Sequence, residues 1–207
     1  MRTIQNNKAI FLFLLLITSI GAFSQKDEKF TSRPTGRGEY SLVAYISGGY
    51  GYYASRSGAP SYLQPTLNKY NPVGTLRIMW HPDHLLKAGL ETGQVTFYNY
   101  DLKDSAGKTG NIALSAIPVL LEWSMSLKKH LNIFAGSGLY LLNTKLDYAG
   151  TVNSKKLSVG WMAAASYIYP LGTQTGLGAE VKWLYAAETS NGTICGQLQL
   201  VWRFLRW

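Results

Sequence analysis

The side chains best able to act as bases, nucleophiles or metal ligands in this chain are three histidines and one cysteine. His81, His84 and His130 all lie in or beside segments typical of tight turns. A hydrolytic triad needs its histidine within hydrogen-bond reach of a nucleophile, and the sequence indicates no such arrangement. His81 and His84 could flank a metal together with Asp83, but one H-P-D-H turn is weak evidence for a metal site. We interpret the histidines as polar turn residues and predict no catalytic residue, metal or other cofactor.

A second set of reactive side chains consists of charged residues inside long extended segments. Four are basic and three are acidic: Arg77, Lys87, Glu91, Glu122, Glu180, Lys182 and Arg203. If they face a common interior, their near balance of sign predicts a structural ion-pair network in the lumen, with a proton or ion relay as the alternative. Glu122 and Glu180 could form a carboxylate pair only if they are adjacent. Cys195 is the single cysteine and is interpreted as a packed thiol.

These charges lie on segments in which apolar residues recur at every second position, which is the pattern of a β-strand with two different faces. In the clearest example, Thr175, Leu177, Ala179, Val181, Trp183 and Tyr185 alternate with Gly176, Gly178, Glu180, Lys182 and Leu184. Eight such strands are predicted from Tyr40 onward, and single-chain outer-membrane barrels have an even number. The expected fold is all-β, an eight-stranded antiparallel up-and-down transmembrane β-barrel over residues 40–207.

The predicted connections alternate in length. Tight turns are expected at residues 82–84, 128–130 and 171–172, and longer polar loops at residues 54–69, 99–110, 143–156 and 187–192. In outer-membrane barrels the short turns are periplasmic and the long loops extracellular. The alternation therefore predicts both termini in the periplasm. Pro118 lies inside a predicted strand, where proline is unusual, and we expect a local β-bulge there.

Each predicted strand that leads into a tight turn, and the last predicted strand, ends with an aromatic residue on its apolar face. These residues are Trp80, Trp123, Tyr167, Tyr169, Trp202 and Phe204, and rings of this kind settle at a bilayer interface, so they predict a periplasmic aromatic girdle. A partial outer girdle is expected from Tyr50, Tyr52, Phe97, Trp183 and Tyr185. A soluble ligand-binding barrel would turn its apolar face inward, but eight strands cannot enclose so many rings. The apolar face is therefore predicted to meet lipid.

The first 24 residues read as a cleaved secretory signal peptide. Arg2 and Lys8 precede the apolar run AIFLFLLLITSI, and Ala22 and Ser24 are small residues at the expected cleavage site. Residues 25–39 are expected to be a periplasmic N-terminal arm. The formal net charge is +9, but the basic residues are scattered and the protein is exported, so nucleic acid is not an expected partner.

Three features resemble the PorT-like and OmpA-like families of Gram-negative outer-membrane β-barrels. They are the signal-peptide end Phe23-Ser24-Gln25, the segment 117–123 (IPVLLEW), and the alternating end from Leu198 to Phe204. The resemblance implies an outer-membrane barrel whose last strand is read by the barrel-assembly machinery through its terminal aromatic. The chain continues to Trp207, which has the opposite parity from Phe204, so the residue that is read stays open. Some PorT-like relatives take part in protein secretion.

The function favoured by these features is structural or partner-binding, through extracellular loops, with a role as an accessory of a secretion or envelope complex. The alternatives are a narrow channel and a lipid A-modifying enzyme. Expected contacts are outer-membrane lipid and lipopolysaccharide, whose phosphates could meet a basic patch of Lys145, Lys155 and Lys156. The protein partner is not indicated by the sequence.

Overall fold

The computed structural model describes residues 40–54, 67–82, 86–103, 109–147, 150–189 and 191–207. The predicted signal peptide and N-terminal arm lie outside the described residues, as do Asp83 and His84. Strands β1 to β9 follow the chain as Ser41–Tyr53, Leu67–Asn68, Tyr70–His81, Leu86–Lys103, Thr109–Ser126, Leu131–Asp147, Thr151–Pro170, Thr175–Ala186 and Asn191–Arg206. A 3₁₀ turn at Ala187–Thr189 joins β8 to β9. No helix in the described part of the chain is long and apolar enough to cross a membrane.

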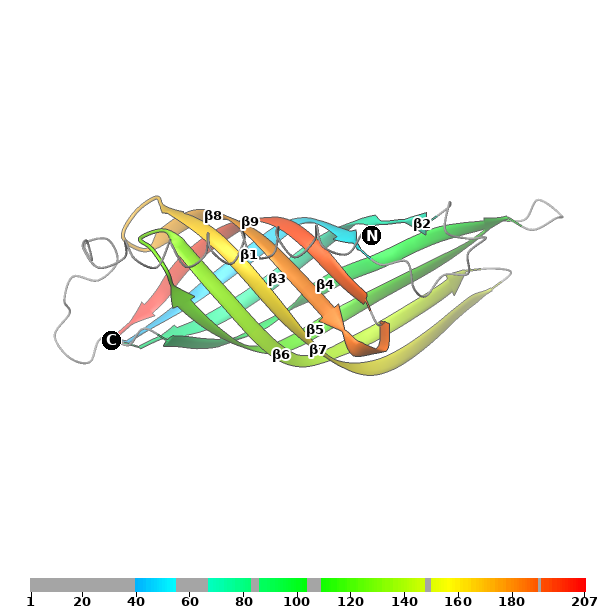
Figure 1. Ribbon diagram of the computed structural model, residues 1–207, viewed down its shortest axis with the longest axis horizontal. Coiled ribbons are helices and arrows are strands. Elements are labelled where there is room, and N and C mark those ends of the chain that lie inside the picture. The colour runs from blue at the N-terminus through cyan, green and yellow to red at the C-terminus, as the bar shows by residue number, and fades with distance from the viewer. Residues whose placement is uncertain (1–39, 55–66, 83–85, 104–108, 148–149, 190) are drawn as a thin grey trace, which may run out of the picture.

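The strands form one closed antiparallel ring (Figure 1). Each long strand, β4 with β5 included, pairs with the long strands before and after it in the chain. The first and last strands, β1 and β9, pair with each other and close the ring. The two-residue β2 pairs with β4 just ahead of β3, so β2 and β3 act as one interrupted strand. The predicted eight-stranded barrel is therefore confirmed. Closure leaves no sheet edge along the body of the barrel.

The ring has two different ends, which we call the turn end and the loop end. The turn end carries the described turns at residues 127–130 and 171–174, and both chain termini of the ring lie there. At the loop end, on the right of Figure 1, β4 to β7 reach farther than β1, β8 and β9. We call this projecting part of β4, β5, β6 and β7 the wall.

Alternation in burial separates the two faces of the barrel. In β8 every second residue from Gly176 to Leu184 is buried and the residues between them are exposed. The outward residues are apolar, with Leu177 49% and Val181 62% exposed, while inward Glu180 and Lys182 are 2% and 0% exposed. An exposed apolar surface of this extent is untypical of a soluble monomer. The apolar face therefore points outward.

Two predicted loops are mostly strand. β4 continues to Lys103 and β5 begins at Thr109, and β6 continues to Asp147 and β7 begins at Thr151. The predicted loops at residues 99–110 and 143–156 were therefore too long. Alternation marks a strand only where one face is buried, and β7 is exposed on both faces from Thr151 to Leu157.

The prediction of a β-bulge at Pro118 was wrong, and the bulge of this strand pair lies elsewhere. Pro118 pairs in register with Tyr140 of β6, and its ladder with β4 is interrupted without a shift in register. Proline has no backbone N–H, so a gap in one ladder is enough to accommodate it. The register of β4 against β5 shifts instead between Thr96 and Tyr98.

A second irregularity lies where the ring closes. The β1–β9 register shifts at Leu42/Val43, which pair with Leu205 and Arg203 and leave Phe204 as the extra residue. Beyond it, Tyr40 and Trp207 exchange backbone hydrogen bonds of 2.9 and 3.0 Å. An extra residue in a strand reverses the inward–outward alternation of the residues beyond it. Phe204 and Trp207 therefore both belong to the exposed surface, at 37% and 57%.

Candidate functional site

The middle of the barrel interior contains an arginine bound by three glutamates. Arg77 of β3 lies 2.5 Å from Glu91, 2.5 Å from Glu122 and 2.9 Å from Glu180, which come from β4, β5 and β8. All four side chains are at most 1% exposed. The planar guanidinium has five N–H donors in a fixed fork, which suits binding several carboxylates at once. One side chain thereby links four strands of the ring.

Lys182 adds a second cation to the same cluster. Its ammonium lies 2.7 Å from Glu91 and 3.0 Å from Glu180, and it donates to the Thr75 hydroxyl at 3.2 Å. We call Arg77, Glu91, Glu122, Glu180 and Lys182 the charge cluster. It holds one more carboxylate than cations, and Glu122 Oε1 is buried without a hydrogen-bond partner among the described residues.

The charge cluster is covered on both sides by side chains. Toward the turn end, the rings of Phe134 and Tyr45 stand 4.1 and 5.6 Å from the Arg77 guanidinium carbon, within range of cation–π attraction. Toward the loop end, Leu120 and Leu184 are completely buried. A water-filled passage lined by charge would leave such groups accessible, so the cluster is part of a packed interior.

Two of the seven predicted lumenal charges lie apart from the cluster. Lys87 is nearer the turn end and donates to the Ser126 hydroxyl at 2.8 Å. Arg203 is half-buried near the end of β9, and its Nε has no hydrogen-bond partner among the described residues. Both face inward, but the stagger of the strands separates them from the carboxylates.

The six residues of the proposed periplasmic girdle all lie on the outer face of the barrel. Their exposed fractions run from 37% to 60% for Trp80, Trp123, Tyr167, Tyr169, Trp202 and Phe204. Tyr40 stacks on Trp80 at 5.9 Å and contacts Trp207 at 6.1 Å. Sequence reasoning missed both residues: the Phe204 bulge that brings Trp207 onto this face has no local signature, and Tyr40 lies just before the start of β1.

The outer girdle was wrong at one position. Phe97 is completely buried in the interior, whereas Tyr50, Tyr52 and Trp183 are 68%, 40% and 47% exposed. Val95 and Phe97 share the inward parity of β4, so the strand's own alternation excludes Phe97 from the lipid face.

The candidate catalytic residues are not brought together. His130 Nδ1 is 2.9 Å from the Ile168 carbonyl oxygen, and His81 Nε2 is 3.4 Å from the Tyr45 hydroxyl. Cys195 is completely buried. In the parts of the chain that the structure describes, no three His, Cys, Asp or Glu residues lie close enough to hold a metal ion.

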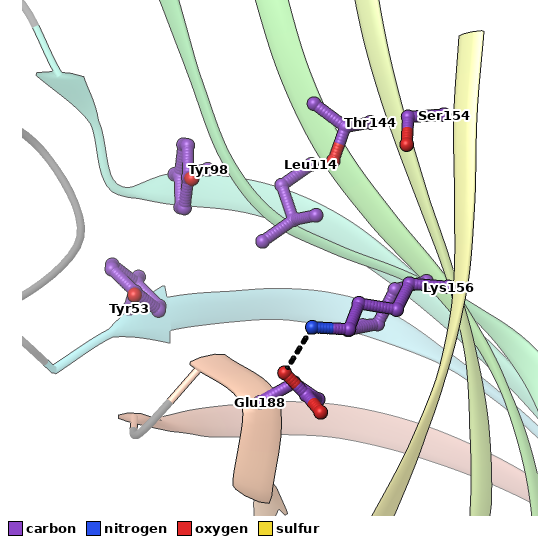
Figure 2. A pocket seen from close by; sticks show the side chains of 8 residues that line it. Tyr53, Tyr98, Leu114, Thr144, Ser154, Lys156 and Glu188 are labelled. Carbon is purple, nitrogen blue, oxygen red and sulfur yellow. Dashed lines mark hydrogen bonds and ion pairs between the residues drawn. The ribbon is translucent and has the colours of Figure 1, made fainter.

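The loop end holds a cavity that sequence reasoning missed (Figure 2). Its volume is about 310 Å³, and its lining residues are Tyr53, Tyr98, Leu114, Leu142, Thr144, Ser154, Lys156 and Glu188. Lys156 of β7 and Glu188 of the 3₁₀ turn form an ion pair of 2.6 Å at its side, drawn as a dashed line in Figure 2. We call this cavity the mouth pocket.

The β4 bulge shapes the mouth pocket. Tyr98 pairs with Leu114 across the ladder, and Phe97 is the additional residue before it. As a result Phe97 and Tyr98, although consecutive, both contact Tyr53, with ring centroids 6.3 and 5.2 Å away. Bulges commonly re-aim side chains in this way. The only signal in the sequence was the aromatic run Phe97-Tyr98-Asn99-Tyr100.

Comparison with solved structures identifies the fold class. The structural match to neisserial surface protein A (NspA) covers 80% of this chain and 99% of NspA, with 13% identity and a TM-score of 0.51. The match to the attachment invasion locus protein Ail of Yersinia pestis covers 81% of this chain and 99% of Ail, with 11% identity and a TM-score of 0.51. The fold is that of a small eight-stranded outer-membrane β-barrel. At these identities the likeness concerns the fold alone.

Neither of the sequence comparisons found a relative. No family model matches this chain, and no curated protein matches it. The predicted likeness to the PorT-like family is therefore not supported, while the likeness to OmpA-like small barrels holds at the level of the fold.

Proposed function

We propose that this protein resides in the bacterial outer membrane and binds an extracellular protein partner through the wall at its loop end. The single observation that carries the proposal is the edge of β7. β7 pairs with β8 only from Gly160, opposite Ala186, to Pro170. From Thr151 to Val159 no other described strand pairs with β7 on that side, although β6 pairs with it on the other. We call residues 151–159 the free edge.

The opposite side of the wall differs from the free edge, because a short strand pairs with part of it. There β2 pairs with β4 through Leu67–Tyr100 and Asn68–Asn99. An exposed strand edge offers a row of backbone N–H and C=O groups that an extended peptide can join. Backbone pairing supplies affinity and side chains supply specificity, so the expected partner presents an extended strand.

The electrostatic setting of the free edge favours a partner with acidic side chains. Within the free edge, Lys155 is exposed and Lys156 is paired with Glu188. Lys145, on the neighbouring β6, is 4.0 Å from Asp147, at the limit of an ion pair. Lys155 thus contributes the least compensated positive charge of the three predicted basic-patch residues. Contacts of this patch with lipopolysaccharide phosphates, and a role beside a secretion or envelope complex, belong to the same proposal.

The charge cluster argues against the alternative of a narrow channel. Its five members are almost fully buried between aromatic and apolar layers. An ion would have to displace buried ion pairs to pass, and breaking such pairs costs several kcal/mol. The barrel is expected to give no stepwise conductance in planar bilayers. A lipid A-modifying activity has no assembled catalytic set in its favour among the described residues.

Site-specific photocrosslinking in intact cells tests the proposal. A photoreactive amino acid at Asn153, within the free edge, should give a discrete adduct with an extracellular protein. The matched control is Leu139, which is 43% exposed on the outer face of the barrel and should crosslink only to lipid. Identical adducts from both positions, or none from Asn153 while the barrel is at the surface, would exclude binding at the free edge.

A further inference from the structure

The mouth pocket has the composition of a site for a small, neutral, hydroxyl-rich molecule. The rings of Tyr53 and Tyr98 and the side chains of Leu114 and Leu142 provide apolar surface. Thr144 and Ser154 add hydroxyls on the wall side, as Figure 2 shows. Hydroxyls both donate and accept hydrogen bonds. A ligand with one apolar face and a polar rim would satisfy both kinds of surface.

The charge balance of the described lining favours a neutral ligand over a strongly ionic one. Among the described lining residues, Lys156 is the only cation and Glu188 the only anion, and they form an ion pair of 2.6 Å. A phosphate, sulfate or ammonium group entering the pocket would have to compete with this ion pair. A neutral ligand can instead use the ammonium as an additional donor and the carboxylate as an additional acceptor.

The size and position of the pocket limit the ligand further. At about 310 Å³ it is at the lower end of the usual range for small-molecule sites. It lies at the loop end, above the apolar layer that covers the charge cluster, so a ligand would arrive from the loop side. An apolar molecule would leave the hydroxyls of Thr144 and Ser154 without a ligand partner.

We propose that the mouth pocket binds a pyranose sugar, as a monosaccharide or as the end of a glycan chain. A pyranose presents a face of C–H groups, whose weak positive charge is attracted to the negative face of an aromatic ring. Its rim of hydroxyls matches Thr144, Ser154 and the Lys156–Glu188 pair. Tyr98 is the principal stacking residue, since the β4 bulge turns it inward and Tyr53 is only 2% exposed. The Tyr98 ring is held by a tilted contact with Tyr53 at 5.2 Å and by stacking on Tyr100 at 6.1 Å.

Saturation-transfer NMR on the full refolded barrel tests this site. The detergent should be a dimethylamine oxide, because glucoside and maltoside headgroups would themselves compete. The probes are methyl β-D-glucopyranoside and lactose at millimolar concentration, with deacylated lipopolysaccharide oligosaccharide as a separate arm. Transfer to the free sugars alone points to an external glycan. Stronger transfer to the lipopolysaccharide oligosaccharide points to the cell's own surface, and either result supports a pyranose site.

Three variants connect the signal to the pocket. Tyr98→Ala should weaken sugar binding about tenfold, as expected for the loss of a ring contact, and Tyr98→Phe should restore most of it. Tyr70→Ala removes an equally large ring that is 67% exposed on the outer face and should leave binding unchanged. All variants should retain a heat-dependent gel shift, which shows that the barrel has folded.

The proposal is overturned if no sugar gives saturation transfer to the folded barrel, or if Tyr98→Ala and the unmodified chain bind equally. It is also overturned if free tryptophan binds while sugars do not, since the pocket would then be an apolar ring site. The proposal does not require a partner at the free edge, because its stacking residue Tyr98 lies on β4, although Ser154 and Lys156 belong both to the free edge and to the lining. Loss of partner crosslinking at Asn153 would therefore leave it standing.

Discussion

The middle and the loop end of this barrel share β4 and β5 but use them in opposite ways. In the middle, β3, β4, β5 and β8 direct five charged side chains into a sealed interior in which none is more than 2% exposed. At the loop end, β4 to β7 continue beyond their neighbours, and β7 is exposed on both faces from Thr151 to Leu157. The middle thus contains buried ion pairs, whereas the loop end contains exposed strands, to which the proposed function assigns partner binding. Changes in the middle should alter folding, and changes at the loop end should alter binding.

The strongest test of this division is Arg77→Ala. It would leave three buried carboxylates with Lys182 as their only cation in the cluster, and breaking buried pairs of this kind costs about 3–5 kcal/mol. The free energy of unfolding, measured with urea on barrels refolded in lipid vesicles, should fall by that amount. Lys128→Ala, in an exposed turn, is the control. A loss below about 1 kcal/mol would mean that the charge cluster does not hold the barrel together.

A sharper test distinguishes the carboxylates within the cluster. Glu91 binds both Arg77 and Lys182, whereas Glu122 has an ion pair with Arg77 alone and a partnerless Oε1. Glu91→Gln should cost about 3 kcal/mol, and Glu122→Gln at most about 1 kcal/mol, because the latter removes the least compensated charge. The same urea titrations compare them. The reverse order would show that Glu122 is the better paired carboxylate.

Proline scanning tests whether the β7 edge is free. Successive backbone N–H groups point to opposite sides of a strand, so one of Val152→Pro and Asn153→Pro should be nearly neutral and the other should lose a bond to β6. In the middle of β7, Met162→Pro and Ala163→Pro should each cost about 2 kcal/mol, because β6 and β8 flank them. Heat-dependent gel shifts and urea midpoints measure the effect. Equal damage at residues 152 and 153 would indicate a partner strand on the edge.

The smallest expected effect belongs to the exposed ion pair at the mouth pocket. The Lys156 and Glu188 side chains are 65% and 41% exposed, and exposed pairs contribute about 0–1 kcal/mol. Lys156→Ala should therefore change stability by less than about 1 kcal/mol, and salt at about 1 M should abolish the difference. Urea unfolding at low and high salt measures it. A salt-resistant loss would place the pair in a drier environment than its exposure indicates.

Alternation explains why the ring and its two faces were predictable. Arg77, Glu122 and Glu180 share a parity with glycines and small polar residues, and the structure places all three inside. Which charges meet was not predictable, because the stagger of neighbouring strands decides it. Lys87 and Arg203 have the same parity as the cluster but lie at another height.

The features that sequence reasoning missed are those that break the period. One extra residue at Phe97 or Phe204 changes which face the following side chains occupy, and nothing in the local composition marks it. Loops were predicted where the wall lies, because its strands are exposed on both faces, as in β7 from Thr151 to Leu157, and so lack a clear alternation. The mouth pocket depends on the bulge at Phe97 and on the wall, so the sequence pattern alone does not reveal it.

The hydrogen-bonded pair of Tyr40 and Trp207 has a consequence for how the ring forms. If β2 and β3 count as one interrupted strand, every other pairing joins neighbours in the chain, whereas β1–β9 joins its two ends. Contacts so distant in sequence form slowly. Until that last pairing forms, the sheet has two open edges. Because the ends meet, a circularly permuted chain that joins them by a short linker and begins at Lys129 should fold to the same barrel. Its slowest step would then move to the β5–β6 pairing.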